Sequence, residues 1–228
     1  MMVLLRKLYS DQVAVSAAEF ALVLPAALLL MFGVIDVGRY AWQLNEYEKA
    51  VQLGTRYAVA TQVVPGALNT ADFSGKTCGS GKVLTAGDTI CTGLMQTIVC
   101  TNTSCSCVSG TGTDCYAGNY NSVAFTNIFS RMRVATSRIA PAQVQIVYSD
   151  SGIGYVGDPA IQTNCSETQA AQIKANCSLP DISPIVTVRL TNQRYYPITL
   201  SLLKSASVPY PDFSFSLTLE DGDGTVAS

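Results

Sequence analysis

The chain has 228 residues, a formal net charge of −2, and charged side chains at only 13% of its positions. This length allows one domain with an anchor or two small domains, and the weak negative charge gives no electrostatic support for binding nucleic acid. Histidine is absent, which excludes Ser–His and Cys–His nucleophile pairs and His-ligated zinc. We therefore expect a protein that is not an enzyme and has no cofactor.

The longest apolar stretch lies near the N-terminus, between Asp11 and Asp36, and Glu19 is the only charged residue within it. A helix over residues 12–35 would be about 36 Å long, enough to cross a hydrocarbon core of about 30 Å. The stretch therefore predicts a transmembrane helix. A charge inside a membrane costs about 2.5–3.5 kcal/mol or more, which makes Glu19 a candidate functional residue. The alternative is a plain membrane anchor in which Glu19 reaches the cytoplasmic interface.

The helical pattern continues beyond the apolar stretch. Apolar residues recur at steps of three and four as far as Ala58, and no proline intervenes before Pro65. This predicts one long helix from about Val13 to Gln62. Pro25 removes a backbone hydrogen bond inside it, so we expect a kink there, although a harmless bend is an equal alternative.

Two independent features predict the orientation of the chain. Arg6 and Lys7 precede the apolar stretch, so the positive-inside rule places the N-terminus in the cytoplasm and everything after about Arg39 outside. All eight cysteines follow the stretch, on the oxidising side, where an even number predicts disulfides. A conventional cleaved signal peptide is disfavoured, because the apolar run ends in Ile35-Asp36-Val37-Gly38-Arg39 rather than at a small-x-small site.

A cysteine-rich insert at 78–115 follows the helix and is dominated by Gly, Thr, Ser and Asn. The spacing of the cysteines leaves the pairing open, apart from a favoured local pair of Cys165 with Cys177. No C-x-x-C spacing is present, which disfavours zinc binding and redox catalysis. The expected disulfide cysteines are Cys78, Cys91, Cys100, Cys105, Cys107, Cys115, Cys165 and Cys177.

The remainder predicts a second helix and several strands. Apolar residues at helical spacing indicate a helix from Asn121 to Ile139. Alternating or β-branched residues indicate strands around 144–148, 185–191 and 212–219, whereas Tyr196 to Leu203 fits a strand or a short helix. The acidic tail at 220–224 resembles half of a calcium loop, but a solvated tail is the simpler interpretation.

These elements predict an α+β fold. A small antiparallel sheet of three or four strands would lay one face on the exported half of the long helix, because this arrangement buries both apolar stripes at once. The disulfide-rich insert would be an addition to this fold, and the resemblance described next implies that the architecture is pilin-like.

The N-terminal sequence carries three recognisable blocks: residues 18–25 (AEFALVLP), residues 28–39 (LLLMFGVIDVGR) and residues 50–58 (AVQLGTRYA). These blocks resemble the TadE-like family of pseudopilins from tight-adherence (Flp-type, type IVc) pilus systems. The likeness covers about residues 9–62 well and does not include the cysteine-rich insert.

The resemblance implies a place of processing. Such precursors are cut by a prepilin peptidase on the cytoplasmic side of the apolar run, with a glutamate at the fifth mature position, which corresponds to cleavage between Ala14 and Val15. This divides the chain into a basic leader (1–14), a transmembrane and extended helix (15–62) and an exported domain (63–228). Alanine stands before the cut where glycine is usual. Cleavage would create an amine on Val15 at the membrane depth of Glu19, so that Glu19 of one subunit can pair with a neighbour's amine during assembly.

The resemblance therefore predicts a minor pseudopilin that is anchored by a single pass in the inner membrane, with its C-terminal domain outside the cytoplasm. Its partners would be other pilins or pseudopilins, the pilus inner-membrane machinery, the prepilin peptidase and the lipid bilayer. The alternative from another class is a membrane-tethered adhesion or binding module whose cysteine-rich insert recognises a surface.

Overall fold

The computed structural model describes residues 12–156, 182–198 and 207–219, with side chains from residue 16 onward. The predicted Cys165–Cys177 pair, the acidic tail and residues 199–203 of the ambiguous segment lie outside the described residues. The chain forms two compact units. One consists of Met1–Leu44 with Arg194–Tyr210, and the other of Asn45–Gln193 with Pro211–Ser228.

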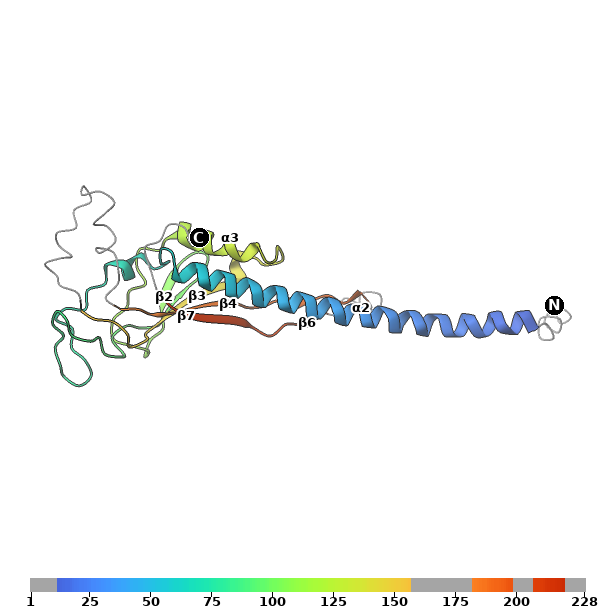
Figure 1. Ribbon diagram of the computed structural model, residues 1–228, viewed down its shortest axis with the longest axis horizontal. Coiled ribbons are helices and arrows are strands. Elements are labelled where there is room, and N and C mark those ends of the chain that lie inside the picture. Colours follow the sequence, from blue (N-terminus) through green and yellow to red (C-terminus); the bar gives the residue numbers. More distant parts are fainter. Residues whose placement is uncertain (1–11, 157–181, 199–206, 220–228) are drawn as a thin grey trace. The chain divides into compact units, whose positions relative to one another are not determined.

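Helix α2 runs from Gln12 to Val59 and contributes to both units (Figure 1). The predicted long helix is therefore present, and Pro25 lies inside it. It ends three residues before the predicted Gln62. The chain bends at Ala60 and Thr61, where the Thr61 hydroxyl donates a hydrogen bond of 2.7 Å to the carbonyl of Tyr57 in the last turn.

A five-stranded antiparallel sheet forms the centre of the second unit, with the strand order β2-β1-β3-β4-β7. Three of its strands are the predicted ones: β3 (Val144–Ser149), β4 (Ile185–Leu190) and β7 (Phe213–Thr218). The prediction of three or four strands was wrong. It missed β1 (Ile98–Cys100) and β2 (Cys105–Cys107), which lie in the cysteine-rich insert.

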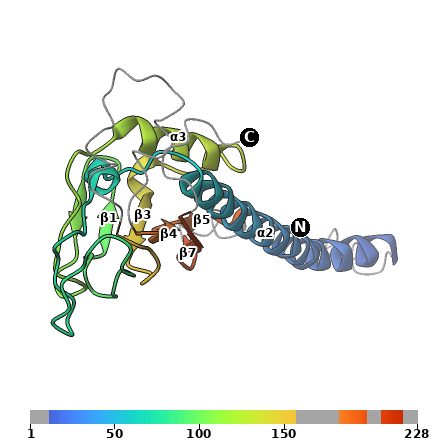
Figure 2. The same cartoon turned by 60° about the vertical axis from the view of Figure 1, so that its left-hand side comes forward.

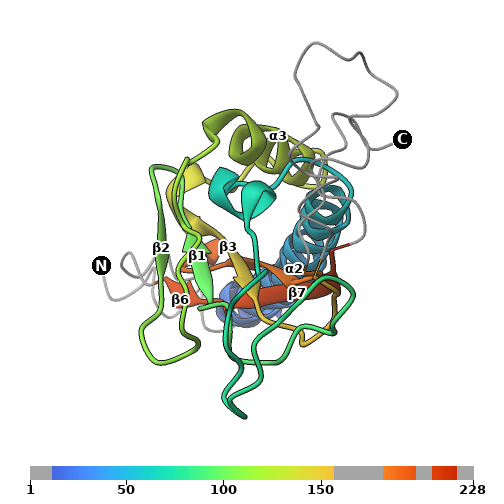
Figure 3. The same cartoon turned by 90° about the vertical axis from the view of Figure 1, so that its left-hand side faces the viewer.

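One face of the sheet packs against the C-terminal part of α2 and against helix α3 (Ser122–Arg133), as Figures 2 and 3 show. The strand register places Ile146, Val188 and Phe215 side by side on this face. Thr55 of α2 donates a hydrogen bond of 3.0 Å to the carbonyl of Phe215. The predicted packing of the sheet on the long helix is confirmed, and with it the α+β fold.

Helix α3 is shorter than predicted. It begins after Asn121, whose side chain accepts hydrogen bonds from the amides of Val123 and Ala124 and so satisfies two free donors of the first turn. It ends at Arg133 rather than Ile139. Ile139 is nevertheless buried, because the chain turns back to the core after α3 instead of continuing the helix.

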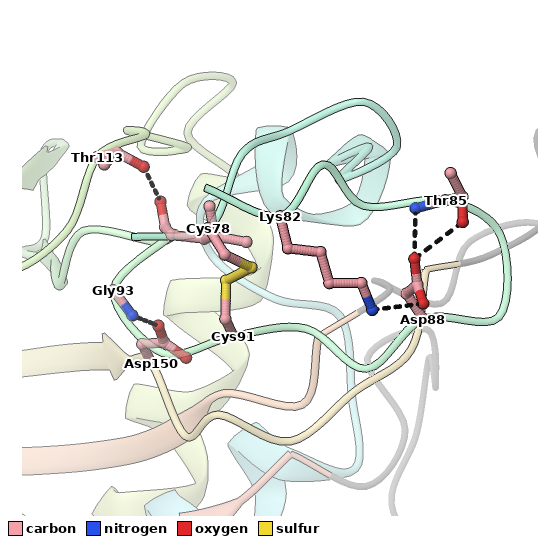
Figure 4. Close-up of a disulfide and its surroundings, with 9 residues drawn as sticks. Cys78, Lys82, Thr85, Asp88, Cys91, Gly93, Thr113 and Asp150 are labelled. Atoms are coloured by element: carbon pink, nitrogen blue, oxygen red, sulfur yellow. Dashed lines mark hydrogen bonds and ion pairs between the residues drawn. A yellow bond between two sulfur atoms is a disulfide. The ribbon is translucent and has the colours of Figure 1, made fainter. Parts of the chain in front are cut away.

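Six of the predicted disulfide cysteines lie in the described residues, and all six are paired: Cys78–Cys91, Cys100–Cys105 and Cys107–Cys115. The Cys100–Cys105 bridge joins opposed residues at the turn between β1 and β2. Figure 4 shows the Cys78–Cys91 bridge and the loop that it closes. Each bridge thus connects residues close in sequence and fixes a local loop of the insert.

Hydrogen bonds to two carboxylates stabilise the loop around Cys78–Cys91. Asp88 accepts hydrogen bonds from Lys82 (2.7 Å) and from the amide of Thr85 (2.9 Å), and these donors lower the pKa of its carboxyl to about 2 (Figure 4). The Asp150 carboxylate accepts a bond of 2.6 Å from the amide of Gly93. Both carboxylates satisfy backbone groups in a segment that has little regular structure of its own.

The first unit contains a short hairpin, β5 (Arg194–Tyr195) paired antiparallel with β6 (Val208–Pro209). Its residues contact the part of α2 that follows the apolar stretch, through Tyr195 and Tyr210. This unit holds the candidate functional site.

Candidate functional site

The apolar stretch of α2 is almost fully exposed along its length. The exposed fraction reaches 80% at Leu22, 72% at Leu30 and 70% at Val37. Among the described residues α2 is the one helix that is long and apolar enough to cross a membrane. A continuous apolar surface of this kind is rare on a soluble protein and marks contact with lipid or with other chains.

Glu19 lies near the start of this exposed surface. Its side chain is exposed, and no cation of the described residues forms an ion pair with it. The backbone of Ala14 and Val15 belongs to α2, and these residues lie five and four positions before Glu19, respectively. The helix therefore holds the predicted processing position and Glu19 on one continuous rod, about one turn apart.

Asp36, at the other end of the apolar stretch, is in the opposite situation. It is only 6% exposed, and its carboxylate accepts hydrogen bonds of 2.9 Å from the Tyr195 hydroxyl and 2.9 Å from the Ile198 amide. Arg39, one turn along the helix, places a guanidinium nitrogen 3.8 Å from the same oxygen, Oδ1. A buried carboxylate needs such partners, because an unpaired one would lose several kcal/mol of solvation.

Aromatic rings surround this carboxylate. Tyr40 stacks on Tyr210 with ring centroids 4.7 Å apart and meets Tyr195 edge-on at 5.5 Å. The Tyr210 hydroxyl donates a bond of 3.0 Å to the side-chain oxygen of the buried Gln43. We call Asp36, Tyr40, Gln43, Tyr195 and Tyr210 the tyrosine clasp, because these residues fasten the β5–β6 hairpin to the helix.

Burial sets the acidity of Tyr195. Desolvation raises the pKa of its hydroxyl, and the hydrogen bond to Asp36 and the negative charge of Asp36 raise it further, while Arg39 opposes the shift. The hydroxyl therefore stays protonated at neutral pH. It can then act only as a donor towards Asp36, which is the role that the carboxylate requires.

Sequence reasoning selected Glu19 and left Asp36 without a role of its own. The partner of Asp36 lies 159 residues later in the chain, so no local spacing connects the two. The available signal was an acid at the end of the apolar stretch with Arg39 one turn further on, together with the tyrosines that flank the later prolines at 195–197 and 209–211.

Comparison with known proteins agrees with the N-terminal features. No curated protein and no solved structure matches the chain significantly. Residues 14–56 match the family model described as TadE-like protein, a range that includes the predicted cleavage position, Glu19, the apolar stretch and the helical half of the tyrosine clasp. The likeness inferred from the sequence blocks is thereby confirmed: residues 14–56 of this chain are similar to the TadE-like family.

Proposed function

We propose that this protein is a membrane-anchored minor pseudopilin that takes part in the assembly of a tight-adherence (Flp-type) pilus or in secretion through a related machine. The observation that carries the proposal is the coincidence of the TadE-like match with the exposed apolar part of α2. The proposal assigns the protein an assembly role and no catalytic one.

The free energy of burying the exposed apolar surface of α2 supports membrane anchoring. Burying an exposed Leu or Phe side chain contributes about 1.5–3 kcal/mol, and the residues from Phe20 to Val37 include eleven large apolar side chains that are at least 40% exposed. Leaving this surface in water would oppose folding strongly. A bilayer, or a bundle of similar helices within one, removes the cost.

The disulfides support the proposed orientation. Arg6 and Lys7 lie before the apolar stretch and favour a cytoplasmic N-terminus. Cys78–Cys91, Cys100–Cys105 and Cys107–Cys115 all follow it, and disulfides persist on the oxidising side of a membrane. The proposal therefore places the C-terminal domain outside the cytoplasm.

Glu19 is the proposed assembly and processing determinant. A prepilin peptidase would cut between Ala14 and Val15 and leave a charged amine at the new N-terminus. In a bundle of subunits that amine can meet Glu19 of a neighbouring copy, and the low dielectric of the membrane makes both charges costly unless they pair. The exposed position of Glu19 on α2 suits contact with another chain.

The mass of the purified protein tests this proposal. We expect a chain that begins at Val15 when a tight-adherence prepilin peptidase is present, and a longer chain when the peptidase is inactive. Glu19→Gln should reduce recovery of the protein with pilus components at least tenfold. The matched control is Glu48→Gln, which removes an exposed acid from the polar part of the same helix. Normal assembly of Glu19→Gln would contradict the assigned role.

The disulfide-bonded insert favours one other candidate, a membrane-tethered adhesion module. Three local bridges hold its loops in fixed shapes, which suits recognition of a surface. In that case the chain keeps its N-terminal leader, and Glu19→Gln leaves location and activity unchanged. The same mass measurement therefore separates the two functions.

A further inference from the structure

The segment that follows strand β5 has two different sides. Tyr195 and Pro197 are buried, whereas Arg194, Tyr196 and Ile198 are exposed. Tyr196 is 65% exposed and Ile198 is 42% exposed. From Arg194 to Pro197 this alternation is that of an extended chain with one side on α2 and the other facing outward. Ile198 already has helical backbone conformation.

Contacts with α2 fix the level of this segment along the helix. Tyr210, one residue beyond β6, bonds to Gln43, and the amide of Ile198 bonds to Asp36. The hairpin thus runs along α2 towards the apolar stretch. Asp36 lies seven residues, or about 10 Å, before Gln43 on the helix, and Ile198 lies at the level of Asp36. Figure 1 shows β6 alongside α2, and its antiparallel pairing with β5 means that the chain returns there in the opposite direction.

The level of Asp36 still belongs to the exposed apolar surface of the helix. Val34 and Val37 are 67% and 70% exposed on either side of it. Further along α2 the exposed residues change from apolar to polar: Trp42 is 68% exposed, and the next exposed residues are Asn45, Glu48, Lys49 and Gln52. Arg39, whose side chain is 44% exposed, is the first exposed charged residue after Val37. The boundary between an apolar and an aqueous environment therefore falls between Arg39 and Trp42.

We propose that Trp42, Tyr196, Ile198 and Val208 form an interfacial rim that extends from the headgroup layer of the bilayer to the outer part of the acyl chains, so that the β5–β6 hairpin is a second membrane-contacting element besides the helix. This inference rests on the proposed membrane anchoring of α2. It adds a depth for the anchor and a role for a part of the chain that the TadE-like match does not include.

The order of side chains along the hairpin indicates lipid as the occupant rather than another protein. Outward residues pass from a cation at Arg194, through an aromatic ring at Tyr196, to an aliphatic chain at Ile198, and they do so towards the apolar stretch. Phosphate groups, the carbonyl layer and acyl chains follow in the same order in a bilayer. Trp and Tyr concentrate at this interface because their rings are amphipathic.

The tyrosine clasp follows from the same placement. Asp36 lies about 9 Å deeper than Trp42 along the helix, a level at which water is scarce and an open carboxylate would be costly. The hydroxyl of Tyr195 and the amide of Ile198 shield it there. The hairpin must then lie at the depth of the carboxylate that it covers.

Tryptophan fluorescence tests the depth directly, because Trp42 is the only tryptophan in the chain. The full chain is reconstituted in phosphatidylcholine vesicles that carry bromine, a quencher, either near the headgroup or near the bilayer centre. Three further proteins combine Trp42→Phe with a new single tryptophan: Tyr196→Trp for the hairpin, Leu30→Trp for the apolar stretch, and Gln52→Trp for the polar part of α2. All three replaced side chains are exposed, so the fold should persist, and circular dichroism checks this.

We expect shallow bromine to quench the fluorescence of native Trp42 and of Tyr196→Trp at least twofold more than deep bromine does. The fluorescence of Leu30→Trp should be quenched by deep bromine, and that of Gln52→Trp by aqueous acrylamide only. Suppose that Leu30→Trp is quenched by deep bromine, as expected. If Tyr196→Trp is then quenched only by acrylamide, by no quencher, or mainly by deep bromine, the hairpin inference is wrong, whereas the proposed membrane anchor is retained. If no bromolipid quenches Leu30→Trp, the proposed membrane anchoring itself is wrong.

Discussion

The Tyr195 hydroxyl lies at donor distance from both the carboxylate of Asp36 (2.9 Å) and the backbone carbonyl of the same residue (2.8 Å). The two residues lie 159 positions apart and belong to the hairpin and to helix α2. Their contact joins the segment between β4 and β7 to the end of the apolar stretch, and it supplies the buried carboxylate with a side-chain donor from the hairpin. The stability of the first unit should therefore depend on it.

Removing the hydroxyl with Tyr195→Phe should loosen the hairpin. The change leaves the ring against Tyr40 but deprives the buried Asp36 of a donor. Loss of a hydrogen bond to a buried charged group costs about 1–3 kcal/mol. We expect proteolysis within residues 194–210 to accelerate at least fivefold when the full chain is digested in detergent micelles. Tyr196→Phe is the matched control, because its side chain faces outward and should change the rate less than twofold. Equal rates for the two variants would contradict the assigned role of Tyr195.

Sequence patterns predicted the elements that are long enough to show the repeat of a helix or of a strand. Strands β3, β4 and β7 each have six residues with alternating or β-branched side chains, and α2 has many helical turns, so both periods are visible in the sequence. Strands β1 and β2 have three residues each. That is too short to display an alternation, and only their pairing with β3 and with each other defines them.

Of the candidate site, one residue was predicted from the sequence and another was not. Glu19 was predicted because its environment is local: an acid inside an apolar run is conspicuous in the sequence alone. Asp36 stands at the edge of the same run, where an acid is ordinary. What distinguishes it is burial beneath Tyr195 and Ile198, and burial by a distant segment has no local sequence signal.

Alkaline pH should destabilise the protein through Tyr148. Burial raises the pKa of this hydroxyl above its ordinary value of 10.0, while the hydrogen bond from the Val64 amide opposes the shift. The folded state therefore keeps a proton that the unfolded state releases above about pH 10, so the stabilisation is complete below that pH and is lost as pH rises. The free energy of unfolding should fall by up to about 1.4 kcal/mol per pH unit above pH 10.

Denaturant unfolding at a series of pH values measures this slope. Tyr148→Phe should reduce this slope above pH 10, because the fully buried hydroxyl at this position is removed. Tyr155→Phe removes a hydroxyl from an exposed ring and should leave the slope as in the unaltered protein. A slope that persists in Tyr148→Phe would assign the effect to other groups.

The disulfide pairing predicts a definite peptide map. Digestion without reductant should yield cross-linked peptides for Cys78–Cys91, Cys100–Cys105 and Cys107–Cys115. The Cys78–Cys91 bridge spans 13 positions, and closing a loop of this size stabilises by about 3 kcal/mol in the chain-entropy model. Replacing both cysteines by alanine should lower the free energy of unfolding by about that amount. Ser80→Ala, an exposed change inside the same loop, should alter it by less than about 0.5 kcal/mol.

At Gly54, helix α2 packs closely against α3 and strand β4. A Cβ atom at this position would lie 2.6 Å from Cγ of Met132 and 3.5 Å from a methyl of Val188. Both of these side chains are fully buried, so they have little room to move. Alanine normally gains about 1 kcal/mol over glycine inside a helix, but overpacking a core costs about 1–3 kcal/mol. We expect Gly54→Ala to lower the free energy of unfolding by about 1 kcal/mol.

A double-mutant cycle separates these two effects, because shortening Met132 removes the clash and leaves the helical preference. In a Met132→Ala background, itself destabilised by its cavity, Gly54→Ala should become neutral or stabilising, which corresponds to a coupling of about 1 kcal/mol or more. Gln52→Ala, at an exposed position of the same helix, should show no coupling to Met132→Ala. If Gly54→Ala instead stabilises the unaltered background, this face of α2 is not packed against α3 and β4, and the contact between the helix and the sheet would have to be redrawn.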